Sequence, residues 1–245
     1  DVTNFVMHEM GTPLHAFDAA ELNGRLVVKT AKDGAKFETL DNVQRELSSI
    51  NLMITNGTKD LCIAGILGGV DSGINDGTTD VFLESALFNP VSIRNSAKMH
   101  ALNTDASFRF ERGVDPNLTD FALKRAALLI QELAGGSIAM EVYDTNSNPV
   151  ENKRVSFDYE RCNRLIGMNM PKKKVNAILK NLDINIISDN VSSAELEIPA
   201  YRVDVTREAD VVEEVLRIYG FNRTGRLIKK NPTAGLYAAK HVPIP

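Results

Sequence analysis

The sequence predicts an α+β protein, in which a mixed α/β domain is followed by a small, mainly helical domain. Short apolar or alternating runs separated by turn residues fill residues 25–85 and indicate β-strands. Helical periodicity dominates later, at 118–134 and 171–182. A polar, turn-rich stretch at 144–153 lies between these regions. The chain of 245 residues is long enough for two cores, and its 43% hydrophobic and 24% charged content is ordinary for a globular protein.

The first domain is expected to open with a strand or core segment formed by Val2, Phe5, Val6 and Met7. Further strands are predicted at the apolar runs, which are 26–28, 37–40, 52–54, 61–64 and 80–88. Asn89 and Pro90 form an N-cap and first helical position, which predicts a helix to about 102. The clearest helix is 118–134, and Gly135 and Gly136 end it.

In the second domain, Asp158 can cap a helix that ends at Gly167, and Pro171 starts another helix. A hairpin is predicted from 184–187 and 196–198, followed by a helix at 209–219 that Gly220 closes. Two or three helices with a small hairpin resemble a winged-helix-like module. We therefore divide the chain into domains at 1–147 and 148–222 and a linker-like tail at 223–245.

Composition excludes several classes of protein. A net charge of −4 argues against a chain that binds nucleic acid through its overall charge. Cys62 and Cys162 lie far apart, which argues against a zinc ribbon or disulfide framework and favours a reducing compartment. No apolar run approaches the roughly 18 residues that a membrane span needs. The opening lacks an initiating Met and a basic signal region, so we expect a fragment of a longer protein.

The segment from Asn103 to Pro116 combines three acids, two arginines and two phenylalanines, and it fits neither a strand nor a helix period. Buried charges must be paired, so this density predicts polar groups held in fixed positions beside a pocket. Arg109, Glu111 and Arg112 are expected to form an internal charge network. Thr104 and Ala106 are small enough to form a pocket wall.

Two further segments contain candidate catalytic or binding groups. His15, within Gly11–Asp18, can exchange a proton near neutral pH; the alternative is a structural histidine that caps a turn. Glu84 interrupts an apolar strand, so it either points outward or needs an inward partner such as a ligand hydroxyl. Gly65, at the end of another apolar run, could present bare backbone to a ligand, although a simple tight turn explains it as well.

An acidic set near the end of the second domain has oxygen ligands only, which suits Mg²⁺ better than Zn²⁺. Its members are Asp204, Asp210, Glu213 and Glu214. The last three share one helix face by their spacing. The alternative is a solvated face near a helix N-terminus, where acids are favourable. The sequence contains no GxSxG, HExxH or Walker motif, so a hydrolase on this chain would position water without covalent catalysis.

Several long motifs resemble the β subunit of bacterial phenylalanyl-tRNA synthetase, in the same order and over most of 1–222. They are DVTNFVM at 1–7, GTPLHAFD at 11–18, IAGILGG at 63–69, LESALFNPVSIR at 83–94, LNTDASFRFERGVDP at 102–116, NRLIG at 163–167 and RVDVTREADVVEEVLRIYGF at 202–221. The chain departs from the family at Phe5, where Tyr is frequent, and at His8, where Leu is frequent. The resemblance also implies that the first domain begins before Asp1.

The resemblance implies that the first domain is an editing domain, which hydrolyses tRNA-Phe mischarged with tyrosine and carries no synthetic site. By the same resemblance, Glu84 binds the tyrosine phenol, and Thr104 and Ala106 form the pocket wall. His15, Thr3, Asn4 and the backbone of Gly65 line the cleft near the ester and the terminal adenosine. Water attacks the ester, and a positioning role for His15 is favoured over that of a general base.

For the second domain the resemblance implies the family's winged-helix-like module, with Mg²⁺ held by Asp204, Asp210, Glu213 and Glu214 and shared with the α subunit. The implied enzyme is a cytoplasmic, ATP-dependent α₂β₂ ligase that binds tRNA-Phe. One alternative is a non-catalytic scaffold that docks tRNA and the α subunit. Another is a standalone nucleic-acid-binding regulator based on the second domain, but the acidic face of its last helix and the net charge of −4 weigh against it.

Overall fold

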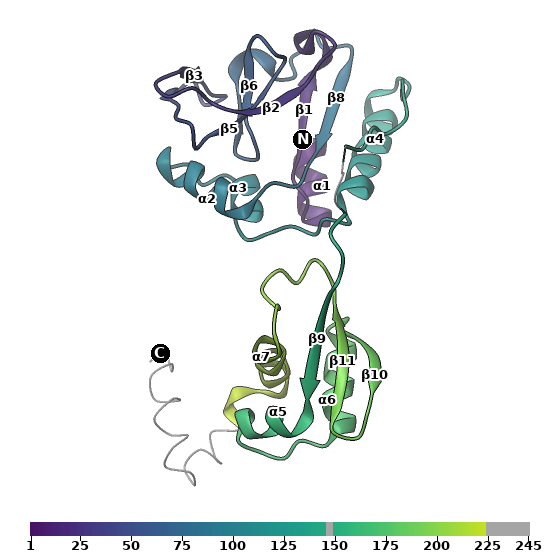
Figure 1. Ribbon diagram of the computed structural model, residues 1–245. Helices are drawn as coiled ribbons and strands as arrows, with labels where there is room; N and C mark the ends of the chain where they lie inside the picture. Colours follow the sequence, from purple (N-terminus) through teal and green to yellow (C-terminus); the bar gives the residue numbers. More distant parts are fainter. Residues whose placement is uncertain (146–148, 224–245) are drawn as a thin grey trace. The chain divides into compact units, whose positions relative to one another are not determined.

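The computed structural model describes residues 1–145 and 149–223 and divides the chain into two compact units, Asp1–Pro149 and Val150–Pro245 (Figure 1). Each unit has its own hydrophobic core and both mix helices with antiparallel sheets. The predicted α+β class is confirmed. The predicted tail at 224–245 lies outside the described residues. Within the described parts, no helix is long and apolar enough to cross a membrane.

The first unit contains four α-helices and eight strands among its described residues. In chain order they are α1 (Val2–Met10), β1 (Leu14–Asp18), β2 (Val27–Thr30), β3 (Lys36–Glu38), β4 (Gln44–Glu46), β5 (Leu52–Thr55), β6 (Asp60–Ile63), β7 (Leu67–Gly68), β8 (Val81–Ser85), α2 (Pro90–Met99), α3 (Asp105–Phe110) and α4 (Thr119–Ala134).

Strands β1 and β8 form a two-stranded antiparallel ribbon with two different faces. One face carries Leu14 and Leu83, which pack with Val6 of α1 and with Ala122 and Ala126 of α4. Helices α1 and α4 lie beside the ribbon in Figure 1. The other face carries the fully buried Phe17, which belongs to the main core of the unit. The ribbon thus separates the α1–α4 helix pair from the rest of the unit.

The main core of the first unit lies between this ribbon, the sheet ordered β2-β5-β6-β7, and helices α2 and α3. Met53, Ile54, Leu61 and Ile63 of the central strands are almost fully buried in it. The short β3–β4 hairpin adds Phe37. The predicted runs at 26–28, 37–40, 52–54 and 61–64 therefore all contribute to strands, as expected from their β-branched and apolar content.

Some local predictions for the first unit differ from the structure. The opening segment is the helix α1 and not a strand, because Val2, Val6 and Met10 recur every four residues and cover one helix face, but its Val6 is buried as expected of a core segment. The segment that contains His15, to which no element was assigned, includes the strand β1. Part of the charged segment after Asn103 is the helix α3, which Thr104 caps by accepting a hydrogen bond from the Ser107 N–H.

The second unit is a three-stranded sheet covered by three helices among its described residues. In order they are β9 (Lys153–Asp158), α5 (Tyr159–Ile166), α6 (Lys172–Asn181), β10 (Asn185–Asp189), β11 (Ser193–Ile198) and α7 (Glu208–Tyr219). The caps at Asp158, Gly167 and Gly220 and the β10–β11 hairpin agree with the predictions.

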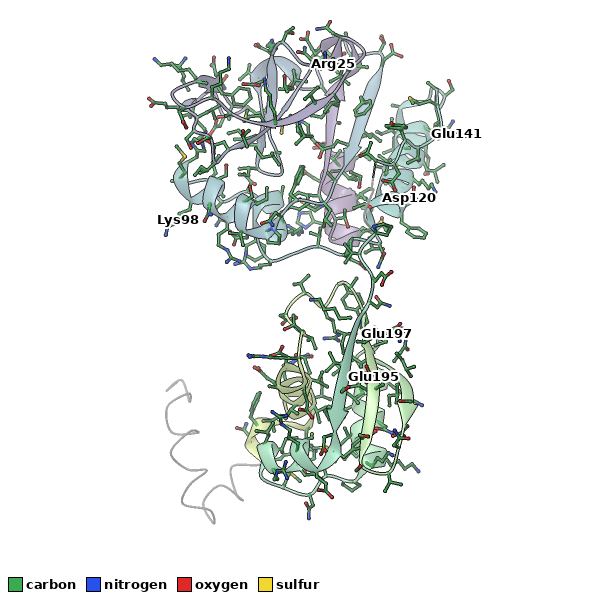
Figure 2. All side chains as sticks on the ribbon, in the orientation of Figure 1. Arg25, Lys98, Asp120, Glu141, Glu195 and Glu197 are labelled. Atoms are coloured by element: carbon green, nitrogen blue, oxygen red, sulfur yellow. The ribbon has the colours of Figure 1, made fainter. Side chains whose placement is uncertain are left out.

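Strand β9, which was not predicted, pairs with β11 and turns the hairpin into a sheet of order β10-β11-β9. On β11, Glu195 and Glu197 alternate with the buried Leu196 and lie on the outer face of the sheet (Figure 2). The inner face packs on the helices through residues such as Phe157, Leu179 and Val215. The helical part of the prediction is confirmed, but the unit contains a sheet as well.

Candidate functional site

The β1–β8 pairing places His15 directly opposite Glu84. Directly opposed residues in an antiparallel pair have Cβ atoms about 4.5–5.5 Å apart and project from the same face. That face is the one that carries Phe17, so both polar side chains point towards the main core of the unit. Both are partly buried. The two first-domain residues that carried the strongest chemical predictions are therefore neighbours.

His15 is held in a tight, largely apolar position. Its ring meets Phe17 edge-on, with 4.4 Å between ring centroids. A Cβ atom added to Gly68 would lie 2.8 Å from His15 Cε1, so the ring rests on the bare backbone of β7. Burial lowers the pKa of His15 to about 4. His15 is consequently neutral near pH 7, and its Nε2 is buried without a hydrogen-bond partner in the described part of the chain.

Glu84 is a carboxyl group in a desolvated position. Burial raises the pKa of Glu84 to about 7. Its carboxylate makes no hydrogen bond or ion pair with any described side chain. The pKa of the buried Cys62 thiol in β6 is raised by burial and further by the negative charge of Glu84, which places Glu84 close to the central sheet. Glu84 is thus available to a ligand group that can hydrogen-bond to it.

Gly65, Thr104 and Ala106 lie together at the turn between β6 and β7. Thr104 Oγ1 donates to the carbonyl of Ile66 at 2.9 Å, which ties the start of α3 to this turn. Ala106, the second residue of α3, is partly buried against the main core. Gly68, only three residues after Gly65, contacts the His15 ring. The turn therefore connects the Thr104–Ala106 wall to the His15–Glu84 pair.

Thr3 and Asn4 lie on α1, apart from this pair. Thr3 is partly buried and Asn4 is exposed. Helix α1 packs through Val6 on the ribbon face opposite to His15. Across the described residues, no hydrogen bond joins Thr3 or Asn4 to His15 or Glu84. The structure thus brings together His15, Glu84 and the wall residues but does not bring Thr3 and Asn4 into direct contact with them.

The predicted internal network of Arg109, Glu111 and Arg112 is wrong. Arg109 pairs with Asp105 at 3.4 Å and donates to His8 Nδ1 of α1 at 3.2 Å. Arg112 pairs with Glu111 at 2.5 Å, and its guanidinium lies 3.6 Å from the Phe108 ring centroid. These are two separate surface pairs, because the side chains of α3 that point inward are Ser107 and Phe110.

The acidic residues of the second unit have other partners. Asp210 caps α7 by accepting hydrogen bonds from the backbone N–H groups of Thr206 and Arg207, which lower its pKa. Glu214 pairs with Arg217 at 2.6 Å and Arg202 at 3.0 Å, and these arginines lower its pKa. Asp204 and Glu213 are exposed.

Among the described residues, no group of three or more His, Cys, Asp or Glu side chains is arranged to hold a metal ion. The donor chemistry suits Mg²⁺, but the four carboxylates do not form a ready site in this arrangement. Magnesium binding by Asp204, Asp210, Glu213 and Glu214 stays a prediction.

The first unit matches the model of a known protein family. Residues 1–135 match the model of the B3/4 domain. The chain belongs to the B3/4 domain family. Residues 155–221 match a second model, that of the tRNA synthetase B5 domain. The His15–Glu84 pair and the Gly65 turn therefore lie in the B3/4 domain, and the acidic residues of α7 lie in the region that matches the B5 model, which we call the B5 domain for short.

The curated relatives that resemble the chain include phenylalanine–tRNA ligase β subunits. The chain is 48% identical over 223 residues to that of Bacteroides fragilis strain YCH46, covering 91% of this chain and 27% of the relative. It is 44% identical over 224 residues to that of Geobacter sulfurreducens, covering 91% and 28%. The chain thus spans about a quarter of the length of these relatives. The resemblance recognised from the sequence motifs is confirmed.

A solved N-terminal fragment of the phenylalanyl-tRNA synthetase β subunit from Pyrococcus horikoshii is also similar to the chain. It shares 15% identity with a TM-score of 0.45, and the match covers 89% of this chain and 62% of the fragment.

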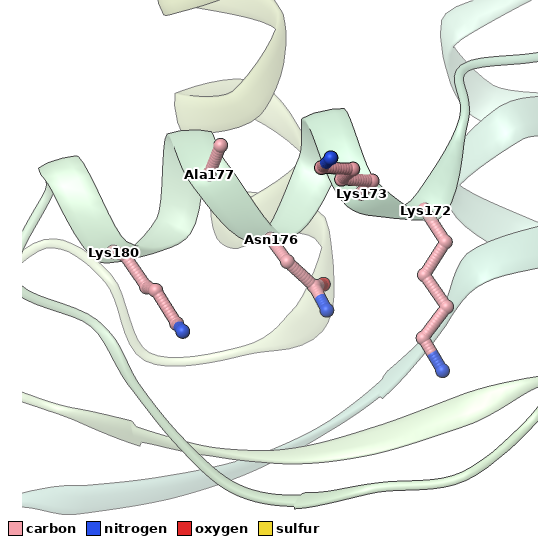
Figure 3. A pocket seen from close by; sticks show the side chains of 5 residues that line it. All are labelled: Lys172, Lys173, Asn176, Ala177 and Lys180. Atoms are coloured by element: carbon pink, nitrogen blue, oxygen red, sulfur yellow. The ribbon is translucent and has the colours of Figure 1, made fainter.

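The B5 domain also carries a shallow groove on α6 with a volume of about 530 Å³ (Figure 3). Lys172, Lys173, Asn176, Ala177 and Lys180 line it. None of the predicted site residues belongs to this groove. In the B3/4 domain, sequence reasoning missed Cys62 as a neighbour of Glu84, because the only signal was a cysteine in an apolar strand.

Proposed function

We propose that the chain is part of a phenylalanine–tRNA ligase β subunit and that its B3/4 domain hydrolyses Tyr-tRNA-Phe. The observation that carries the proposal is Glu84, a partly buried carboxyl without a protein partner among the described side chains, directly opposite His15. An apolar synthetic pocket rejects an added hydroxyl poorly, so a ligase for phenylalanine needs a second site that recognises the tyrosine hydroxyl. A carboxylate supplies that recognition by accepting the phenol O–H hydrogen bond.

In this proposal the chain orients the ester and a water molecule without a covalent intermediate. The water oxygen attacks the ester carbonyl carbon, the bond from that carbon to the ribose oxygen breaks, and the ribose oxygen takes a proton. His15, with a pKa near 4, is a weak base and acts as a neutral group that positions the ester or water. Thr104 and Ala106 bound the tyrosine ring, and Gly65 offers backbone.

Thr3 and Asn4 bind the terminal adenosine of the tRNA in this proposal. Because they have no direct bond to the His15–Glu84 pair, the bound RNA spans the distance between α1 and the pair. The same separation favours the second candidate function, a scaffold that docks tRNA and the α subunit without catalysis. The two are distinguished by whether Glu84 controls clearance of the mischarged tRNA.

The whole enzyme in this proposal is a cytoplasmic α₂β₂ ligase whose ATP-dependent synthetic site lies outside this chain. Mg²⁺ is shared between the B5 domain and the α subunit. Asp204 and Glu213 are exposed and ready to bind, whereas Glu214 must first leave Arg202 and Arg217. Glu214 can leave these arginines for Mg²⁺ if the α subunit supplies further metal ligands. A new ion-pair partner for the two arginines has the same effect.

The magnesium proposal predicts that the 245-residue chain alone binds Mg²⁺ too weakly to measure at millimolar concentrations, because two of the four carboxylates, Asp210 and Glu214, already cap a helix or pair with arginine. Isothermal titration calorimetry of the chain, with and without the α subunit, is the measurement. Binding that appears with the α subunit and disappears in Glu213→Gln supports the proposal. Tight binding to the chain alone would contradict it.

The pKa of Glu84 predicts a pH dependence of tyrosine recognition. Ionised Glu84 accepts the phenol hydrogen bond more strongly than protonated Glu84, so KM for Tyr-tRNA-Phe should fall as the pH rises through about 7. Steady-state deacylation between pH 6 and pH 8.5 measures the profile. Glu84→Gln has no charge to titrate and should flatten it. A profile that is the same in both proteins would assign the titration to another group.

A further inference from the structure

Two phenylalanines on neighbouring helices are exposed to solvent beside the candidate site. Phe5 of α1 is 54% exposed and Phe108 of α3 is 46% exposed. Neither belongs to a hydrophobic cluster of the B3/4 domain. Exposed aromatic side chains without a packing role indicate a binding surface when polar and charged groups surround them. We name the surface formed by Phe5, His8, Phe108, Arg109 and Arg112 the α1–α3 face.

The α1–α3 face is continuous across the two helices. Phe5 and His8 are three residues apart and share the solvent side of α1. His8 accepts from Arg109 across the helices at 3.2 Å, which joins α1 to α3. Phe108 and Arg112 are four residues apart on α3, and Arg112 lies over the Phe108 ring. An extended ligand can therefore cross from one phenylalanine to the other past both arginines.

The arginines of the face are available for exchange with a ligand anion. The side chain of Arg109 is 22% exposed and pairs with Asp105 at 69%, and the side chain of Arg112 is 54% exposed and pairs with Glu111 at 25%. Each arginine also donates to a backbone carbonyl of α3, Arg109 to Asp105 and Arg112 to Phe108. Each pair keeps one well-exposed partner, and surface pairs contribute about 0–1 kcal/mol. A phosphate group can accept two parallel hydrogen bonds from one guanidinium. It can therefore replace the carboxylate partner of either arginine at little cost in free energy.

The face adjoins the residues that bound the proposed site. Asn4 precedes Phe5 on α1, and Ala106 is three residues before Arg109 on α3. A chain that crosses the face consequently reaches both the adenosine residues and the pocket wall. Alternating aromatic rings and cations, without a hydrogen-bonding pattern that reads bases, are typical of surfaces that bind single-stranded nucleic acid.

We propose that the α1–α3 face binds the single-stranded 3′ end of the RNA whose terminal ester enters the B3/4 domain. Phe5 and Phe108 stack on successive bases, Arg109 and Arg112 contact the phosphates between them, and His8 holds Arg109 in place. The proposal rests on the proposed function, because it names how the RNA substrate of that same site is held. It assigns binding roles to Phe5 and His8, which the proposed function leaves without one.

The test uses the intact ligase that contains this chain and compares two tyrosyl esters. One is Tyr-tRNA-Phe, and the other is tyrosyl-adenosine, which lacks the nucleotides that would cross the face. The double variant Phe5→Ala/Phe108→Ala should raise KM for Tyr-tRNA-Phe at least about tenfold, since stacking of one base contributes about 1–3 kcal/mol. Hydrolysis of tyrosyl-adenosine should stay within about twofold of wild type on the same reasoning.

Matched variants control for loss of a surface ring or charge. Phe221→Ala removes a phenylalanine that is equally exposed at 54% in the B5 domain, and Lys98→Ala removes an exposed cation of α2 (Figure 2). Both should leave both esters unaffected. Phe5→Tyr keeps an aromatic ring and should retain the low KM. A double variant that affects the two esters equally, or neither, would overturn the proposal.

A binding measurement separates this proposal from the proposed function. Fluorescence anisotropy of a labelled, uncharged single-stranded RNA that ends in CCA is measured with the same variants. If the wild type hydrolyses neither ester, the proposed function fails, and weaker RNA binding by the double variant still supports the face. Equal binding of this RNA by the wild type and the double variant would refute the face whatever the hydrolysis result.

Discussion

Glu84→Ala is expected to abolish a preference for clearing Tyr-tRNA-Phe over Phe-tRNA-Phe if the proposed function holds. In that proposal the variant loses the acceptor for the tyrosine hydroxyl, and a hydrogen bond to an ionised group contributes about 1.5–3 kcal/mol, or roughly 10–150-fold in kcat/KM. Glu84 makes no hydrogen bond or ion pair with the described residues, so its truncation leaves none of them with an unsatisfied polar group. Truncation also relieves the burial of a carboxyl whose pKa is raised to about 7. The loss should therefore appear in selectivity and not in stability.

The measurement is deacylation of Tyr-tRNA-Phe by the complete ligase, with Phe-tRNA-Phe as the second substrate. Glu38→Ala, which removes an exposed carboxylate of β3 in the same domain, is the control for loss of charge. Selective loss of Tyr-tRNA-Phe clearance in Glu84→Ala alone would locate hydroxyl recognition in the B3/4 domain. Equal clearance by wild type and Glu84→Ala would favour the scaffold function instead.

The stability of the chain gives an independent check on Glu84. Its pKa is raised on folding, so its contribution to stability is greatest at pH values below its ordinary pKa of 4.5 and is lost as the pH rises through about 7. The sign is opposite for His15, whose pKa is lowered to about 4: its contribution is present above pH 6.5 and is lost as the pH falls through about 4. Glu84→Gln should accordingly stabilise the chain more at pH 8 than at pH 5.

Sequence patterns predicted the elements whose signals are local. The helix α4 and the caps at Asn89 and Asp158 follow from periodicity and from side chains that satisfy free N–H groups. Strand β9 was missed because its outward side chains are polar, and its two buried residues, Val155 and Phe157, give too short an alternation. Helix α1 was missed because its packed face repeats only three times in nine residues, and the adjacent Phe5, Val6 and Met7 hide that period.

The site was only partly predictable. His15 and Glu84 could be selected because each is a titratable group in an apolar setting, but their pairing depends on the register of β1 with β8, which no local pattern specifies. The contact of Gly68 with His15 depends in turn on how the central sheet packs against that ribbon. For the acidic residues of α7, the spacing correctly placed them on one helix face but could not show that arginines already pair with Glu214.

Gly65→Ala is the second change with a large expected effect, because two costs combine at one position. Gly65 has φ +66°, a left-handed conformation that costs a residue with a Cβ about 1–2 kcal/mol. The new Cβ would lie 2.8 Å from Phe88, 2.9 Å from Ile93 and 3.0 Å from Phe110, all buried core side chains. Overpacking of a core typically costs a further 1–3 kcal/mol or so. The free energy of unfolding should fall by roughly 2–5 kcal/mol in total.

Gly34→Ala separates the two costs, because Gly34 has φ +77° but nothing within 4 Å of an added Cβ. It should lose only the backbone part, about 1–2 kcal/mol. Hydrogen exchange of strands β5 and β6 in increasing urea reports the unfolding of the B3/4 domain separately from the B5 domain. If Gly65→Ala costs no more than Gly34→Ala, the three side chains move aside and the turn is not fixed by the core. If Gly65→Ala costs more than Gly34→Ala and also slows Tyr-tRNA-Phe hydrolysis, the core side chains under Gly65 fix the β6–β7 turn. Thr104 is hydrogen-bonded to that turn, so the packing under Gly65 then sets the geometry of the pocket wall.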